Sequence, residues 1–582
     1  MKTIQLDFNQ FNTRREVHEF LKKELDFPEY YGHNLDALHD LLSVYSEEIR
    51  IEVVPGKPEI GHGFICVFKD VAEENNRVKI AILSGPETGD KMEEKTTLRI
   101  GFNRTDITPK NGGIPLAGYG ATHLRLAAEI IDRLYANTIV IGHEKPEFVL
   151  ITVDMINVRE YYLEQFRDAI TEALGVPRGQ IFIGGTHTHS APDYWSSLDS
   201  ITTYFATLPE ILTDSAKRAA ADMLPTKIFY GRGEVGVPGC RFNFVKHYKM
   251  ARRDTLERLG LKAEDLVREN SWEEKLPPKE IYDVGDNYGG EYSGDPEHYV
   301  YVGHEEMADP EMQVVRFDRE NADSIVIINF QAHATVTGGR LFTKMSSDFP
   351  GPLREEFERM VPHTKCIFYQ GAAGNLNTHT RIVSEGLTNI TYGCYKIGRN
   401  HRAYAAVLAG VAYRINDLFM QESESDVVDF RKYIMTAPCD HTNDAKVEDA
   451  KKIREIYMAE GYTDRVTELC RELGFNSPYH ANATISKSKL PETDTMEMNV
   501  LRFGDVGMIT APVEMFNTTG MFIKKNSPFK MTIIKAYSTG SDSYMPSINA
   551  YKNAYEWNLC NFMPGTAEKM ADKYVEMLKE IF

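Results

Sequence analysis

Hydrophobic and polar residues form short, regular patterns over the first 84 residues of the chain. They alternate over residues 3–8, which predicts a strand with one buried face. Thr13 and Glu16 then stand at the N-cap and capping-box positions of a helix, and residues 34–42 predict a second amphipathic helix. The order of elements indicates a small α/β domain at residues 1–84. Further strands are expected at residues 51–54, 64–68 and 78–83.

The pattern changes after residue 84. Residues 85–96 are polar, carry Gly and Pro and show no apolar periodicity, so we expect a linker there. Beyond it, apolar runs alternate with helical stretches, which predicts a large layered α/β domain at residues 97–582. Two charged stretches, residues 249–285 and the helical segment 444–473, are expected to be surface insertions away from catalysis. The clearest strands are at residues 148–153 and 181–183, and the clearest helices at residues 161–174 and 208–223.

Charge and composition restrict the partners and the location. The formal net charge of −19 disfavours nucleic acid, because an acidic surface repels a polyanion. The chain has no apolar run of about 18 residues, so we expect no transmembrane segment, and its start lacks the apolar core of a signal peptide. The 7 cysteines are odd in number and form no CxxC pair, which suits a reducing compartment. We therefore expect a cytoplasmic protein.

Residues 27–40 carry a long motif within the first domain. Their sequence, FPEYYGHNLDALHD, closely resembles the signature of the barstar family, intracellular inhibitors of the ribonuclease barnase. The resemblance covers the whole domain and implies a small three-stranded parallel sheet, with a barnase-like ribonuclease as partner. It implies a partner-binding surface made by Tyr30, Tyr31, Asp36, His39, Asp40 and Asp70.

The acidic residues of this motif also suit such a partner on physical grounds. Asp36 and Asp40 are four residues apart on the predicted helix, so both carboxylates lie on one face, where they can replace RNA phosphates. Residues 1–84 hold ten Lys and Arg against fifteen Asp and Glu. The resulting charge of −5 favours approach to a basic nuclease, an attraction for which barnase and barstar are the standard example. The alternative is an ordinary solvated helix face, and the family's tryptophan before the second aspartate is His39 here.

Two histidines stand two residues apart where an apolar strand of the large domain ends. Residues 184–192, GGTHTHSAP, contain His187 and His189. In an extended chain, side chains two residues apart point the same way, and two convergent imidazoles suit a zinc ion. His333 follows another apolar strand, within residues 327–335. Taken singly, each of these histidines could also be a core residue with satisfied hydrogen bonds.

Several segments together resemble the neutral (non-lysosomal) ceramidase family, from about residue 98 to residue 582. In order, they are residues 107–109, 116–120, 133–136, 184–192, 327–335 and 370–377. That family hydrolyses an amide with one zinc ion held by two histidines, a glutamate and a tyrosine. The resemblance implies that Zn2+ is held here by His187, His333, Glu514 and Tyr544. It implies catalytic or substrate-contacting roles for His189, Arg241, Tyr544 and Tyr555.

The residue types suit this chemistry. A catalytic zinc with few protein ligands leaves a place for water, whose pKa the ion lowers to about 7. The other polar residues of the set can stabilise the oxyanion or protonate the leaving amine. Where the family has a histidine before its Arg-Leu-Tyr-Ala segment, this chain has Asp132. We therefore expect a small-molecule or lipid-like N-acyl amide as substrate rather than ceramide itself.

Three hypotheses follow from these residues. The first is a zinc-dependent hydrolase of a linear amide bond that carries a barstar-like module. The second is a binding protein that inhibits a ribonuclease, in which the large domain is a scaffold or an inactive enzyme. The third is that the acidic module covers the pocket of the large domain as an internal regulator. Metal analysis, titration with a barnase-like ribonuclease and deletion of residues 1–90 separate the three.

Overall fold

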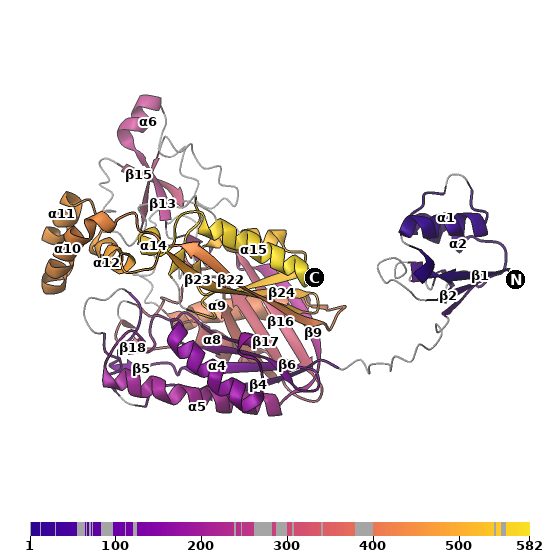
Figure 1. Ribbon diagram of the computed structural model, residues 1–582, viewed down its shortest axis with the longest axis horizontal. Helices are drawn as coiled ribbons and strands as arrows, with labels where there is room; N and C mark the ends of the chain where they lie inside the picture. Colours follow the sequence, from indigo (N-terminus) through magenta and orange to yellow (C-terminus); the bar gives the residue numbers. More distant parts are fainter. Residues whose placement is uncertain are drawn as a thin grey trace. The chain divides into compact units, whose positions relative to one another are not determined.

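The computed structural model divides the chain into two compact units, Met1–Lys95 and Thr96–Phe582 (Figure 1). Each unit is described by itself, and the expected linker at residues 85–96 lies outside the described residues. The structure describes residues 2–11, 13–28, 31–54, 64–65, 67–68, 71–72, 74–82, 97–110, 112–119, 125–237, 240–241, 243–245, 247–260, 282–286, 299–304, 308–338, 341–378, 400–540, 543–548 and 555–582.

A parallel sheet and two helices form most of the first unit. The elements are β1 (Lys2–Asp7), the 3-10 turn η1 (Phe8–Gln10), α1 (Arg14–Glu24), α2 (Leu35–Ser43), β2 (Ile49–Val54) and β3 (Val78–Ile82). The strands pair in parallel in the order β1-β2-β3, which confirms the predicted three-stranded parallel sheet. Side-chain oxygens of Thr13 and Asn34 accept hydrogen bonds from backbone N–H groups in the first turns of α1 and α2, so both helices begin at residues suited to capping.

The predicted strand at residues 64–68 is wrong. Residues 64, 65, 67 and 68 are helical. Phe64, Phe68 and Val71 are fully buried and follow one another at intervals of four and three residues, which is the spacing of one helix face. A short apolar run fits a buried strand and a buried helix equally well, and here the packing decides for the helix.

A nine-stranded sheet lies at the centre of the second unit. Its strands are β4 (Arg99–Asp106), β6 (Tyr135–Gly142), β7 (Pro146–Val153), β8 (Ile181–Gly185), β9 (Leu224–Glu234), β16 (Glu311–Arg319), β17 (Ser324–Phe330), β19 (Thr364–Gln370) and β21 (Gln421–Glu422). They run in the order β19-β17-β16-β9-β4-β6-β7-β8, with β21 paired to β9. The pairs β7–β8 and β17–β19 are parallel, so within each pair the two carboxyl ends lie at the same edge of the sheet.

A second sheet packs on one face of the first. Its strands, in spatial order, are β22 (Val428–Pro438), β23 (Thr493–Phe503), β24 (Val506–Thr510) and β26 (Met531–Lys535). Along β7, Phe148 and Leu150 belong to the core between the sheets, whereas Val149 and Ile151 belong to the core under the helices. Because both faces are buried, β7 is apolar along most of its length.

Helices cover the outer face of each sheet, so the unit has four layers and the predicted layered α/β class is confirmed. The larger sheet is covered by α4 (Glu160–Leu174), α5 (Asp199–Ala221), α8 (Pro350–Met360) and α9 (His401–Leu418). The smaller sheet is covered by α13 (Asn517–Asn526) and α15 (Thr566–Glu580). The helix expected at residues 208–223 begins earlier, at Asp199, because α5 continues through Pro209.

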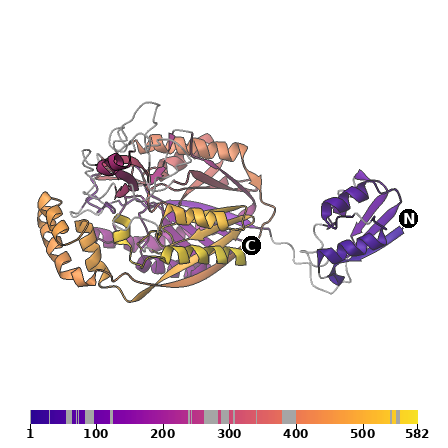
Figure 2. The ribbon, with the colours of Figure 1, turned by 90° about the horizontal axis from the view of Figure 1, so that it is seen from above.

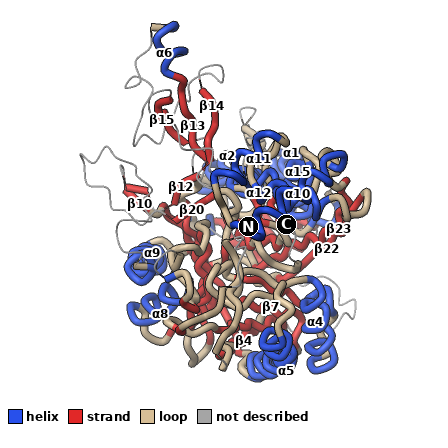
Figure 3. The backbone as a smooth tube through the Cα atoms, turned by 90° about the vertical axis from the view of Figure 1, so that its left-hand side faces the viewer, coloured by secondary structure: helices blue, strands red, loops and turns tan. Residues whose placement is uncertain are grey.

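Smaller elements complete the second unit. Three helices between β22 and β23 gather at one end of the unit, orange in Figure 2. A small sheet with α6 projects from the body (Figure 3). These elements are α10 (Val447–Glu460), α11 (Asp464–Glu472), α12 (Pro478–Lys487), β13 (His247–Arg252), α6 (Arg253–Leu259), β14 (Tyr282–Asp286) and β15 (Tyr299–His304).

The remaining elements are short. They are β5 (Glu129–Ile130), η2 (Arg178–Gln180), β10 (Gly236–Val237), β11 (Cys240–Arg241), β12 (Asn243–Val245), β18 (Lys344–Met345), β20 (Leu376–Thr378), η6 (Asp444–Lys446), β25 (Glu514–Met515), β27 (Tyr544–Met545) and α14 (Tyr555–Leu559). Among the described residues, no helix is both long and apolar enough to cross a membrane.

Candidate active site

The segment with two histidines begins where β8 ends. The backbone N–H groups of Thr186 and His187 donate to the carbonyls of Val153 and Met155, and both N···O distances are 2.9 Å. Gly185 lies so close to the neighbouring chain that a Cβ there would stand 2.6 Å from the Met155 oxygen. His187 adopts a left-handed backbone with φ of 64°, a conformation that costs energy outside glycine. The glycine-rich turn thus places His187 beside the loop that follows β7.

Three imidazoles meet at this point. His187 Nε2 lies 3.0 Å from His333 Nε2 and 3.2 Å from His189 Nε2. His333 follows β17 and is 146 residues away from His187 in the sequence. All three side chains are buried, and they form a group of the kind that holds a metal ion. The fold therefore brings together the two strand ends that carried the histidine motifs.

Backbone carbonyls fix which nitrogens of two of these rings carry protons. His187 Nδ1 lies 2.8 Å from the Ile156 oxygen, and His333 Nδ1 lies 2.9 Å from the Ala373 oxygen. A carbonyl only accepts, so each Nδ1 carries a proton and donates it. In the neutral ring each Nε2 then keeps a lone pair, and the two lone pairs face each other. Metal-ligating histidines have this arrangement.

A carboxylate completes the cluster. Glu514 Oε2 lies 3.3 Å from His187 Nε2 and 3.5 Å from His333 Nε2, and the Glu514 side chain is 16% exposed. Two lone pairs and a carboxylate repel one another unless a cation lies between them. In tetrahedral zinc sites with bonds of about 2.0–2.1 Å, ligand atoms stand roughly 3.3 Å apart. The donor types and their separations therefore fit a zinc ion.

The predicted tyrosines lie beside this cluster. Strand β25 pairs in parallel with β27, and the register sets Glu514 opposite Tyr544. Side chains of directly paired residues point to the same face of a sheet, so Tyr544 lies next to Glu514. The ring centroid of Tyr555, at the start of α14, is 6.0 Å from that of Tyr544. The Arg241 side chain lies outside what the structure describes, so its role stays a prediction.

Tyr537 is a member of the site that the sequence did not reveal. Its ring stacks on His187 with centroids 3.9 Å apart. Burial raises the pKa of Tyr537 well above its usual value, with a smaller contribution from the negative charges of Glu514 and Glu556, so the phenol keeps its proton. Its backbone is also left-handed, with φ of 55°. No local pattern marks this residue; only its position just after β26 brings it to the cluster.

The loop before residue 120 closes around His189. Gly118, with φ of 89°, is so near that a Cβ would stand 2.4 Å from His189 Nδ1. The Tyr119 ring centroid is 5.1 Å from that of His189. The buried guanidinium of Arg125 donates to the carbonyls of Ala117 and His189. Burial lowers the pKa of Arg125 to about 10, so the group stays charged at neutral pH. This loop therefore fixes the backbone of His189.

A buried ion pair supports the strand ends beneath the cluster. Arg354, in α8, donates to both carboxylate oxygens of Asp154 at 2.6 and 2.9 Å. The two side chains are 2% and 0% exposed. Asp154 also accepts from the Thr186 hydroxyl and from the Tyr135 backbone. The pair thus links three chain segments next to His187.

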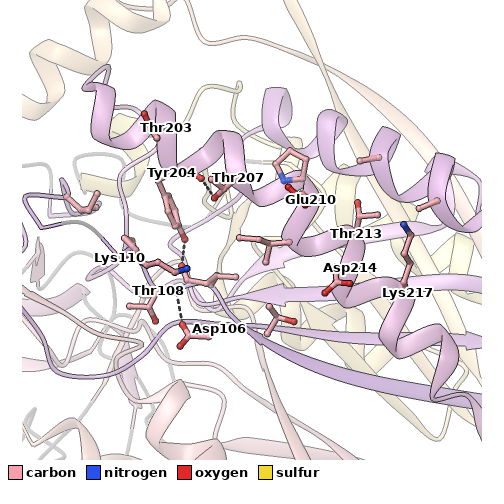
Figure 4. A pocket seen from close by; sticks show the side chains of 18 of the residues that line it. Asp106, Thr108, Lys110, Thr203, Tyr204, Thr207, Glu210, Thr213, Asp214 and Lys217 are labelled. Carbon is pink, nitrogen blue, oxygen red and sulfur yellow. Dashed lines mark hydrogen bonds between the residues drawn. The ribbon is translucent and has the colours of Figure 1, made fainter.

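A large surface cavity of the same unit has a different character (Figure 4). It measures about 1170 Å³ and lies along α5 and the loop after β4. Its wall includes Tyr204, whose hydroxyl donates to the Ile107 carbonyl over 2.7 Å. None of its lining residues is a histidine or a cysteine. We therefore place the candidate chemistry at the histidine cluster instead.

The predicted binding surface of the first unit is only partly described. Asp40 is exposed on α2, and the half-buried His39 lies 3.4 Å from the carboxylate of Glu74. The ring of Tyr31 is buried, and its hydroxyl is 2.5 Å from His18 Nδ1. Tyr30, Asp70 and the Asp36 side chain lie outside the described residues, so the whole surface stays a prediction.

The two units resemble two different kinds of known protein. A small parallel-sheet α/β domain with an acidic helix is followed by a four-layer α/β domain with a buried histidine–carboxylate cluster. Residues 1–81 match the family model described as Barstar (barnase inhibitor). Over 70 residues, 12% of this chain and 76% of the relative, the sequence is 49% identical to YrdF of Bacillus subtilis (strain 168), whose name proposes a ribonuclease inhibitor. Through its first unit, the chain belongs to the barstar family.

The larger part of the chain has the fold of neutral ceramidase. The crystal structure of neutral ceramidase from Pseudomonas aeruginosa matches 84% of this chain and 75% of its own, with a TM-score of 0.56 and 18% identity. A structure described as ceramidase complexed with C2 gives a TM-score of 0.55 over the same shares, also at 18% identity. The protein is thus a barstar domain fused to a domain of the ceramidase fold.

Proposed function

We propose that the large unit is a zinc-dependent hydrolase of a linear N-acyl amide. The convergence of two Nε2 lone pairs and the Glu514 carboxylate carries the proposal. In it, His187, His333, Glu514 and Tyr544 hold the zinc ion. The same proposal takes residues 1–84 and 97–582 as domains joined by residues 85–96, in a cytoplasmic protein.

Each residue of the site is assigned a separate role in the reaction. When bound, zinc polarises the amide carbonyl and lowers the pKa of water. His189, whose Nε2 is 3.2 Å from His187 Nε2, is placed to hold a proton and pass it to the leaving amine. Tyr555 and Arg241 are assigned to the oxyanion, which O–H and N–H donors stabilise most in a site closed to water. Tyr537 keeps the His187 ring in place by stacking on it.

The first unit supports a second function in the same chain. Membership of the barstar family favours binding of a barnase-like ribonuclease through α2. Of the acidic residues on the predicted partner-binding surface, Asp40 is the one whose side chain the structure describes, and it is exposed. The two functions are compatible, because each rests on residues of its own unit.

Metal content and amide hydrolysis test the enzyme. We expect about one zinc per chain and hydrolysis of at least one member of an N-acyl amide panel that includes ceramide. His187→Ala should lose both. His143→Ala is the matched control: His143 pairs with Glu147 at the start of β7, and the cluster lies at the other end of that strand. Wild-type protein without metal, or equal activity in both variants, would refute the proposal.

A further inference from the structure

The helix that carries Tyr555 depends on its neighbours for its position. Helix α14 has only 5 residues, far fewer than an isolated helix needs for stability in water. The Tyr555 ring contacts the rings of both Tyr544 and Tyr479. The centroids of Tyr555 and Tyr479 are 5.7 Å apart, with the ring planes at 84°. Edge-to-face ring pairs of this kind stabilise a contact beyond the effect of the area they bury.

Tyr479 belongs to the helices between β22 and β23, just beyond residues 444–473, the segment that we expected to lie away from catalysis. It stands in the first turn of α12, where the hydroxyl of Ser477 caps the helix. The rings of Tyr457 and Tyr462 contact it from α10 and from the loop that follows, at 5.9 and 6.3 Å. Helices α10, α11 and α12 share a hydrophobic core of their own, so Tyr479 is held on a packed support.

A series of hydrogen bonds connects the other end of α12 to the segments around Tyr544 and α14. Lys487 Nζ lies 2.8 Å from Asp440 Oδ2, and the two side chains are 7% and 16% exposed. The backbone N–H of Asp440 donates to the Asn561 carbonyl, and the backbone N–H of Asn561 donates to the Ser543 hydroxyl. Both donor–acceptor distances are 2.8 Å. Asn561 follows α14, and Ser543 precedes Tyr544. Both ends of α12 therefore meet the segments that carry the two predicted tyrosines.

We propose that Tyr479 is a positioning residue for Tyr555, and that the helices at residues 447–487 form a wall of the active site. The role in catalysis rests on the proposed function of Tyr555. The dependence of α14 on Tyr479 does not, because it follows from the ring contact and the short helix alone. Since displacing a reacting group by about 1 Å can cost on the order of a hundredfold in rate, loss of this contact should act on turnover.

Kinetics of the full-length zinc-loaded protein test the catalytic part. Tyr479→Leu removes the ring, and we expect kcat to fall about tenfold or more with little change in KM, because the geometry of Tyr555 is lost while the zinc ligands stay in place. Tyr479→Phe keeps the ring and should retain wild-type kcat. Zinc content should be the same in all variants. A rise in KM alone, or equal loss in Tyr479→Phe, would overturn the proposal.

Hydrogen exchange of the peptide that contains α14 tests the structural part without any substrate. Its backbone amides should exchange faster in Tyr479→Leu and at the wild-type rate in Tyr479→Phe. Val466→Ala is the control: it weakens the buried core of the helical segment from α11 and keeps the Tyr479 ring and its aromatic neighbours. If α14 exchanges equally in Val466→Ala and Tyr479→Leu, the segment acts only through its general stability and Tyr479 has no special role.

The two measurements separate the possible failures. Faster exchange of α14 in a protein that hydrolyses no amide would support the contact and refute the proposed function. Unchanged exchange in Tyr479→Leu, in a protein that is an active amidase, would refute the positioning role and leave the proposed function standing.

Discussion

The two units hold their candidate sites in opposite ways. The predicted surface of the first unit lies mainly on one helix, where Asp36 and Asp40 are four residues apart. The site of the second unit unites residues from His187 to Tyr555, and its histidines are buried. Water and salt screen charges on an exposed helix, but they screen a buried cluster much less. Substitutions should therefore weaken the first site by degrees and abolish the second.

The two units should differ most in the stability they lose when a paired arginine is replaced, because one arginine is buried and the other is exposed. Arg354→Met leaves Asp154 buried without its counter-ion, and we expect it to destabilise the second unit by about 3–5 kcal/mol. Arg15→Ala breaks an exposed pair with Glu19 and should cost the first unit only about 0.3–0.5 kcal/mol. Urea unfolding measured on each unit checks both values. Similar losses in the two variants would contradict the contrast between the units.

Zinc affinity gives the next effect. Glu514→Gln keeps the shape of the side chain but removes its charge beside two lone pairs. Changes outside the ligand set typically cost 10- to 100-fold in metal affinity, so we expect a loss of at least about 100-fold here. Competition with a chelator measures it. Glu147→Gln, on the surface beside His143, is the control with the same chemical change.

Ribonuclease binding should respond more weakly to a single charge. Asp40→Ala removes an exposed carboxylate from α2, and we expect the Kd for a barnase-like ribonuclease to rise at least about tenfold, with a weaker dependence on salt. Glu19→Ala makes the same change of charge on α1, outside the predicted surface, and should alter binding little. Calorimetry at two salt concentrations compares them. Equal effects would mean that only net charge matters.

The smallest effect concerns pH. Burial lowers the pKa of Lys535 to about 7 from the ordinary 10.5, and its ammonium group contacts Ser538 and the face of Tyr369. Between these two values the unfolded chain binds a proton that the folded chain does not, so this residue makes stability rise with pH. Lys535→Met should remove a slope of up to about 1.4 kcal/mol per pH unit. Urea unfolding at pH 7.5 and 9.5 tests it, with the exposed Lys530→Met as control.

Much of the fold followed from local patterns. The alternation at residues 3–8 predicted β1, and the capping residue Thr13 predicted the start of α1. Both predictions succeed because neighbouring residues alone determine which side chains share one face of a strand or helix. The run at residues 64–68 failed because its length suits either type of element. Helix α5 begins at Asp199 rather than at the predicted residue 208, because Pro209 lies inside the helix although a proline more often stands in a first turn.

For the candidate site, the sequence by itself supplied the residue types and their order along the chain. It marked His187, His189 and His333 at strand ends and, through resemblance, Glu514 and Tyr544. Only the tertiary structure decided that His187 Nε2 comes within 3.2 Å of the Nε2 atoms of His189 and His333, that Tyr537 stacks on His187, and that Tyr479 contacts Tyr555. The reason is physical: local sequence sets backbone periodicity, whereas contacts between distant segments depend on how two sheets and their helices pack.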